Sequence, residues 1–257
     1  MTRMDQTLLS AVTRIARDAG EAIMDVYARG FSVTEKADHS PLTEADLAAH
    51  RVIVAGLAAL PEAIPILSEE DAGSFSRPDA QARYWLVDPL DGTKEFIKRN
   101  DEFTVNIALI ERGRPVLGVV LVPVTGVAYV AAAGLGAHKI HADGKCVAIS
   151  VAGRPAAGAT WRVMGSRSHA GVALAGWLET LGAHELTPVG SSLKSCLIAE
   201  GRADVYPRLG PTSLWDTGAA QAVLEQAGGR VVDLAGESLG YADPAQTLNP
   251  SFVAWGF

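Results

Sequence analysis

The chain has 257 residues, 48% of them hydrophobic and 20% charged, which excludes a disordered protein and allows a sizeable buried core. Its formal net charge of -7 argues against a nucleic-acid-binding surface, which requires clustered Lys and Arg. No apolar run has the length of a membrane span, and the two cysteines, Cys146 and Cys196, lie outside any CxxC motif. We therefore expect a cytoplasmic protein without a disulfide framework. Peripheral membrane association stays open, as does the choice between monomer and homodimer.

Two amphipathic helices are predicted near the N-terminus. In the first, over 5–28, apolar residues recur every three or four positions, and Gly30 closes the helix. In the second, Thr43 is a suitable N-cap and Pro61 ends the helix. The side chains expected on the buried side of this second helix are Leu47, Val54, Leu57 and Leu60.

Strands are predicted to follow. The short apolar runs 65–67 and 84–87 are typical of buried strands, and each leads directly into acidic residues. The glycines of Gly134-Leu135-Gly136 are expected to form a turn. Between 103 and 149, β-branched runs alternate with hairpin-turn sequences, which predicts an antiparallel meander packed on the two helices, with strands at 105–110, 116–122, 127–131 and 146–149.

The Gly-, Pro- and Ala-rich stretch 152–159 is a candidate domain boundary. It would separate an N-terminal α+β part, 1–152, from a smaller C-terminal α/β part, 153–257, with a ligand cleft between them. Past the boundary, helices are predicted at 171–181, 193–200 and 215–227, and strands at 161–164, 184–189, 203–209, 230–234 and 252–255.

The strongest chemical signal is the run DPLDGT at 88–93, directly after the predicted strand 84–87. The carboxylates of Asp88 and Asp91 and the carbonyl of Leu90 would present three oxygens to one point. Oxygen ligands of this kind suit a hard divalent cation and favour Mg²⁺ over Zn²⁺.

The same run opens a predicted helical turn over 94–98. Free N–H groups at such a start, beginning with Gly92 and Thr93, are suited to binding phosphate. An isolated Asp-Gly pair would indicate only a turn. The functional interpretation therefore depends on further carboxylates from other segments.

Three such carboxylates are present, and each also has a purely structural interpretation. Glu69 follows the strand 65–67 but could belong to a solvated acidic turn. Asp46 stands three residues after Thr43, which also fits a capping box. Asp216 begins a predicted helix, where a carboxylate stabilises the dipole. Together they could complete a multi-metal site. Zinc-ligand histidine spacings, a GxSxG elbow and a GxxxxGK[ST] loop are absent from the sequence.

The run WLVDPLDGTKEF at 85–96, with SEE at 68–70 and WDTGAAQAVLEQAGG at 215–229, resembles the inositol-monophosphatase-like superfamily of Mg²⁺-dependent, Li⁺-sensitive phosphatases. The resemblance runs nearly end to end and implies an α+β / α/β fold, a layered αβαβα sandwich. Within the superfamily, KADHSPLTEAD at 36–46, KEF at 94–96, GSRSH at 165–169, SSLK at 191–194 and YPRLGPTS at 206–213 are similar to the bacterial 3′(2′),5′-bisphosphate nucleotidases. This implies hydrolysis of adenosine 3′,5′-bisphosphate, a by-product of sulfate activation, to AMP and phosphate.

The resemblance also implies roles for individual residues. Two or three Mg²⁺ ions would be held by Glu69, Asp88, Leu90, Asp91 and Asp216, with Asp46 on an additional, weaker ion. Glu69 or Asp46, with Thr93 orienting the attacking water, would remove its proton. Gly92 and Thr93 would bind the scissile phosphate. The substrate would also contact Glu69, Leu90, Asp91 and Asp216, and the rest of the nucleotide would meet Lys194, Arg208, Ser166 and His169.

Two departures from the family pattern concern substrate identity. Leu214 stands where relatives commonly have an acidic residue, and Gly218-Ala219-Ala220 replaces the usual Ala-Ala-Gly after Asp216. Two alternatives therefore stay open. One is a phosphatase for inositol 1-phosphate or another sugar phosphate that uses the same site. The other is a non-catalytic, metal-binding regulatory protein that has kept the fold.

Overall fold

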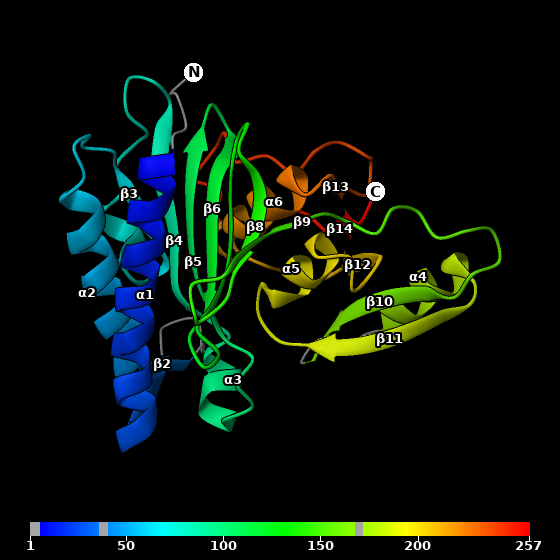
Figure 1. Cartoon of the computed structure of the whole chain (residues 1–257), viewed down its shortest axis with the longest axis horizontal. Helices are drawn as coiled ribbons and strands as arrows, with labels where there is room; N and C mark the ends of the chain where they lie inside the picture. The colour runs from blue at the N-terminus through cyan, green and yellow to red at the C-terminus, as the bar shows by residue number, and fades with distance from the viewer. Residues whose placement is uncertain (1–5, 36–40, 168–171) are drawn as a thin grey trace.

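Helices and sheets alternate in five layers, in the order αβαβα, in a computed structural model that describes residues 6–35, 41–167 and 172–257 (Figure 1). The first layer is α1 (Gln6–Arg29) and α2 (Glu44–Ala58), and the second is a seven-stranded sheet. The third contains α5 (Leu193–Ala199) and α6 (Gly218–Gln226), the fourth is a five-stranded sheet, and α4 (Val172–Leu181) is the fifth. This confirms the layered sandwich. None of the described helices is long and apolar enough to cross a membrane.

The two N-terminal helices form as predicted, but the buried side of α2 matches the expected one only at Leu57. Ala45, Ala49, Ile53 and Leu57 are buried, whereas Leu47 is exposed and Val54 and Leu60 are only half-buried. Alanines alternate with larger apolar residues on this face, and α2 lies close against α1. A Cβ added to Gly56 would come within 2.8 Å of the Ile15 side chain. Close helix packing therefore outweighs the position of the largest apolar side chains.

The seven-stranded sheet has the order β3-β4-β5-β6-β7-β8-β9. Its first pair, β3 with β4, is parallel, and the remaining pairs form the predicted antiparallel meander. The strands are β3 (Ile66–Ser68), β4 (Arg83–Asp91), β5 (Thr104–Glu111), β6 (Arg114–Val122), β7 (Val127–Ala132), β8 (Gly136–Ile140) and β9 (Cys146–Ile149). β8 was not predicted, because only Ala137 in it is buried and the strand therefore lacks the apolar run of an interior strand.

The middle layer sits unusually close to this sheet. A Cβ added to Gly118 on β6 would lie 2.2 Å from the backbone oxygen of Ala219, the second residue of α6. The predicted helix 215–227 is divided in two, because the 3₁₀ turn η2 (Leu214–Asp216) precedes α6. Asp216 therefore lies in a separate turn and not in the first turn of the α-helix, contrary to expectation.

The five-stranded sheet has the order β11-β10-β12-β14-β13. Its strands are β10 (Trp161–Ser166), β11 (His184–Val189), β12 (Val205–Arg208), β13 (Arg230–Asp233) and β14 (Phe252–Trp255). β10 runs parallel to β11 and β12, and β14 is antiparallel to β12 and β13. One hydrophobic cluster contains residues from both sides of the 152–159 stretch, among them Leu86 and Cys196. The division into two domains stays a prediction.

Three short elements complete the chain. β1 (Val33–Glu35) pairs with β2 (Pro41–Thr43), and the 3₁₀ turn η1 (Glu69–Ser74) follows β3. The predicted helical turn after the DPLDGT run is α3 (Thr93–Lys98). Phe96 of α3 packs against Tyr27 and Phe103, with ring centroids 5.0 and 5.2 Å apart. This aromatic contact anchors α3 on α1 and so fixes the DPLDGT segment.

Candidate active site

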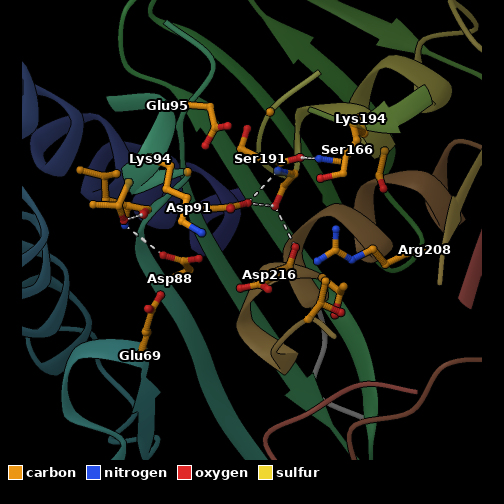
Figure 2. Close-up of a pocket in the computed structure, with 18 of the residues that line it drawn as sticks. Glu69, Asp88, Asp91, Lys94, Glu95, Ser166, Ser191, Lys194, Arg208 and Asp216 are labelled. Atoms are coloured by element: carbon orange, nitrogen blue, oxygen red, sulfur yellow. Dashed lines mark hydrogen bonds between the residues drawn. The ribbon is translucent and has the colours of Figure 1, made fainter. Parts of the chain in front are cut away.

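A cavity of about 270 Å³ opens where β4, α3, β12, η2 and the start of α5 meet (Figure 2). It contains nearly every site residue expected from the sequence: Glu69, Asp88, Leu90, Asp91, Gly92, Thr93, Ser166, Lys194, Arg208 and Asp216. Asp46 is buried and reaches this group through Thr93. His169 lies outside the described residues. The tertiary structure therefore brings residues from distant parts of the chain to one place.

A β-bulge gives the DPLDGT segment its geometry. The sequence analysis placed Asp88 at the end of a strand, but β4 continues to Asp91 with a register shift between these two residues. Asp88 pairs with Asn106 and Asp91 with Thr104, so three steps on β4 match two steps on β5. In a regular strand, residues three apart face opposite sides of the sheet. The extra residue restores both carboxylates to the same side.

Asp88 is the most buried of the cavity carboxylates, with 1% of its surface exposed. It shares a hydrogen bond with Glu69, and Figure 2 shows these two side chains pointing toward each other. Burial, followed by the negative charges of Glu69 and Asp91, raises the pKa of Asp88 well above its usual value. The Leu90 N–H donates to Asp88 Oδ1 over 3.0 Å.

Asp216 reaches the same cavity from η2. Its Oδ2 accepts a 2.9 Å hydrogen bond from the Ser213 N–H, which completes a capping box. Burial and the nearby charge of Asp91 raise the pKa of Asp216 to about 8, although the Ser213 N–H opposes the shift. Several buried carboxylates thus lie close together, and a bound cation would offset the repulsion between their negative charges.

The donor set fits a hard cation. Among the described residues, no three His, Cys, Asp or Glu side chains stand close enough to surround one ion. Mg²⁺ does not need such a cage, because it keeps several waters and is commonly bound by one or two carboxylates together with substrate phosphate. Carboxylates distributed around a shared cavity, beside the half-exposed loop of Gly92 and Thr93, match that requirement.

Asp46 has the structural role that its spacing suggested. Its Oδ2 accepts from the N–H and the hydroxyl of Thr43, at 2.8 and 2.6 Å, in a capping box at the start of α2. Its Oδ1 accepts from the Thr93 hydroxyl at 3.2 Å. Asp46 thereby orients Thr93, and its proposed contact with a weaker metal ion stays a prediction.

Lys194 and Arg208 line the opposite side of the cavity. The Lys194 ammonium donates to the backbone oxygens of Val189 and Ser191, at 3.2 and 2.5 Å, so it also holds the loop before α5. Burial lowers the pKa of Lys194 to about 8, against the opposing charge of Asp91. The Arg208 guanidinium donates to the Pro211 oxygen through Nη2, while its buried Nε has no hydrogen-bond partner among the described residues. The charged guanidinium suits an anionic ligand in the cavity that Arg208 lines.

Two residues that contact Asp91 were missed by the sequence analysis. Asn106 on β5 and Ser192 before α5 both donate hydrogen bonds to Asp91 Oδ2. A signal for Asn106 was present, because it is a lone amide within the apolar strand TVNIALI, and buried amides need partners. Ser192 carries no comparable local signal.

The model of the inositol monophosphatase family matches residues 4–253. The chain belongs to the inositol monophosphatase family.

Several members of the inositol monophosphatase family are close relatives. The chain is 51% identical over 247 residues to the 3′(2′),5′-bisphosphate nucleotidase CysQ of Escherichia coli O157:H7, covering 95% of this chain and 98% of that protein. It is 36% identical to the nucleotidase of the same name from Haemophilus influenzae, covering 100% and 95%. The crystal structure of CysQ from Bacteroides thetaiotaomicron superposes with a TM-score of 0.82 at 39% identity, covering 98% of this chain and 97% of that one.

Proposed function

We propose that this protein is a Mg²⁺-dependent phosphatase that hydrolyses adenosine 3′,5′-bisphosphate to AMP and phosphate. The observation that carries the proposal is one cavity with two kinds of wall. Figure 2 shows Glu69, Asp88 and Asp91 on one side of the cavity, Lys194 and Arg208 on the other, and Asp216 between them. The relatives named as 3′(2′),5′-bisphosphate nucleotidases, at up to 51% identity along nearly the whole chain, support this substrate.

The carboxylate wall would hold two or three Mg²⁺ ions. The proposed ligands are Glu69, Asp88, the Leu90 carbonyl, Asp91 and Asp216, with Asp46 on an additional, weaker ion. When bound, Mg²⁺ neutralises charge on the phosphate and on the leaving oxygen and lowers the pKa of a bound water. Buried carboxylates with raised pKa values, such as Asp88 and Asp216, are stabilised by such ions.

The residues around Thr93 would guide the attacking water. Gly92 adopts φ +94° at the N-cap of α3, where a Cβ would come within 3.1 Å of the Glu102 oxygen, so a glycine allows the phosphate-facing turn. Thr93 would orient the water, whose proton passes to Glu69, or through the Thr93 hydroxyl to Asp46. The water oxygen then bonds to phosphorus as the bond to the 3′ oxygen breaks, and the 3′ oxygen takes a proton from solvent to become the hydroxyl of AMP. Positioning and charge suffice for this displacement.

The cationic wall would bind the rest of the nucleotide. Arg208 and Lys194 are placed to meet the second phosphate, with Ser166 beside them. The positive charges of the Arg208 guanidinium and the Lys194 ammonium are the features that favour an anion at this end of the cavity. A substrate with two separated phosphates would therefore use both walls, whereas a simple phosphomonoester would use one.

A substrate panel tests the proposal. The enzyme would be assayed with adenosine 3′,5′-bisphosphate, inositol 1-phosphate and fructose 1,6-bisphosphate, in Mg²⁺ and with added Li⁺. We expect the highest kcat/KM for the adenosine bisphosphate, no turnover after chelation of Mg²⁺, and inhibition by Li⁺. A higher kcat/KM for inositol 1-phosphate would overturn the substrate assignment, and the absence of Mg²⁺-dependent hydrolysis for all three would overturn the enzyme class.

A further inference from the structure

Ser192 joins the segments of two cavity carboxylates. It is 6% exposed and lies directly before α5. Its N–H and its hydroxyl donate to Asp91 Oδ2 over 2.7 and 2.6 Å, and its Oγ also lies 2.8 Å from the backbone oxygen of Asp216. One hydroxyl therefore sets the spacing between the end of β4 and the η2 turn.

Asn106 supports the same oxygen from a third segment. It is 1% exposed on β5, and its Nδ2 donates to Asp91 Oδ2 at 3.1 Å and to Ser192 Oγ at 2.7 Å. The Thr104 hydroxyl donates to Asn106 Oδ1 over 3.1 Å, and this hydrogen bond fixes the orientation of the amide. The amide and the hydroxyl therefore act as one unit around Asp91.

Three hydrogen-bond donors contact Oδ2 of Asp91, which leaves Oδ1 for a ligand. A carboxylate oxygen that meets three donors at 2.6 to 3.1 Å is held in direction. Oδ1 is then the oxygen that Asp91 offers to the cavity it lines. Groups that orient a metal ligand in this way act on metal affinity without touching the metal.

We propose that Ser192 and Asn106 are positioning residues that aim Asp91 Oδ1 at a divalent cation. The proposal rests on the cation site of the proposed function. It adds that the hydrogen bonds on Oδ2 determine cation affinity. Because Ser192 is in the loop whose carbonyls bind the Lys194 ammonium, the segment that faces the nucleotide and the carboxylate that faces the cation belong to one hydrogen-bonded unit.

A purely structural role is the alternative, in which the buried polar network stabilises the fold and leaves cation binding unaffected. Direct cation binding separates the two. Mn²⁺ would be titrated into the whole metal-free protein and free Mn²⁺ followed by electron paramagnetic resonance, while thermal unfolding is measured on the same samples. The variants are Ser192→Ala, Asn106→Ala and the hydroxyl-retaining Ser192→Thr. Ser195→Ala, in the first turn of α5 and also in the cavity lining, is the matched control.

We expect Ser192→Ala and Asn106→Ala each to weaken Mn²⁺ binding by about tenfold or more, the loss typical of groups that support a metal ligand. Ser192→Thr is expected to stay within about threefold of the wild type, and Ser195→Ala to be unchanged. Wild-type Mn²⁺ affinity in both alanine variants, with or without a lower Tm, would overturn the proposal. The titration contains no nucleotide. A protein that shows these losses but does not hydrolyse adenosine 3′,5′-bisphosphate would therefore contradict the proposed function alone.

Discussion

Thr93 and Asp46 stand 47 positions apart in the chain, and the hydroxyl of Thr93 donates a 3.2 Å hydrogen bond to Oδ1 of Asp46. The other oxygen of Asp46 completes the capping box of α2 with Thr43. One carboxylate thus begins a helix and orients a side chain of the cavity. The two interpretations that its sequence spacing left open, helix cap and catalytic group, are compatible.

A comparison of the variants Asp46→Ala and Thr43→Ala separates these two roles. Thr43→Ala removes the hydroxyl cap but keeps the Asp46–Thr93 bond, whereas Asp46→Ala removes both. We expect each to lower the free energy of unfolding by about 1 kcal/mol, as cap losses do. Only Asp46→Ala should also lower kcat, by about tenfold or more, if it assists proton removal from the attacking water. Equal kcat values in the two variants would assign Asp46 to the helix alone.

Asp91→Asn should reduce turnover far more than stability. The amide keeps the size of the side chain but removes the charge that a cation requires. Removal of a group that merely supports a metal ligand lowers metal affinity or activity by about 10- to 100-fold. We therefore expect Asp91→Asn to lower kcat for adenosine 3′,5′-bisphosphate by more than about 100-fold. Circular dichroism should show an unchanged fold. Near-wild-type turnover would remove Asp91 from the proposed ligand set.

A substitution of Arg208 tests nucleotide recognition with less effect on the backbone than a substitution of Lys194. Lys194→Ala also releases the two carbonyls that its ammonium holds, and so changes the loop itself. Arg208→Gln removes the guanidinium charge from the lining of the cavity. We expect the KM for the bisphosphate to rise about tenfold, the loss of roughly one charged hydrogen bond, with kcat/KM for p-nitrophenyl phosphate unchanged.

The matched control for Arg208 is Arg202→Gln, which removes an exposed arginine paired with Glu200. Its KM values should equal those of the wild type. Equal losses for both substrates in Arg208→Gln would place Arg208 in the scissile-phosphate region or in the fold.

Metal-free protein should become less stable as the pH rises, and Mg²⁺ should reverse this. The pKa of Asp216 is raised to about 8 in the folded protein, from a reference value of 3.8. Between these values the folded chain binds more protons than the unfolded chain, so the free energy of unfolding falls as the pH rises through this window. Mg²⁺ competes with the proton, so its stabilisation should grow in the same direction.

Thermal unfolding measures this effect directly. The increase in Tm on adding Mg²⁺ should be larger at about pH 9 than at about pH 6, because little protonated Asp216 remains above its pKa. Asp216→Asn, which cannot titrate, is the control and should show a weaker dependence on pH. A Tm increase that is the same at both pH values in the wild type would contradict a raised carboxyl pKa at the cation site.

The sequence by itself determined where most of the helices and strands form, and it singled out four carboxylates that line the cavity, Glu69, Asp88, Asp91 and Asp216. Helical periodicity predicted α1, and the apolar runs before acidic residues predicted β3 and β4. The DPLDGT run identified Asp88 and Asp91 as cavity residues. These features are local: apolar periodicity, a cap such as Thr43 and a carboxylate pair are all written within a few consecutive residues.

Only the tertiary structure decided how those residues are supported. The bulge that turns Asp88 and Asp91 to one side depends on pairing with β5, and Ser192 meets Asp91 across 101 positions of sequence. Asp216 lies in a separate 3₁₀ turn, where Gly118 lets the start of α6 approach the sheet. Contacts between distant segments depend on how whole layers pack, and they cannot be predicted from a pattern of neighbouring residues.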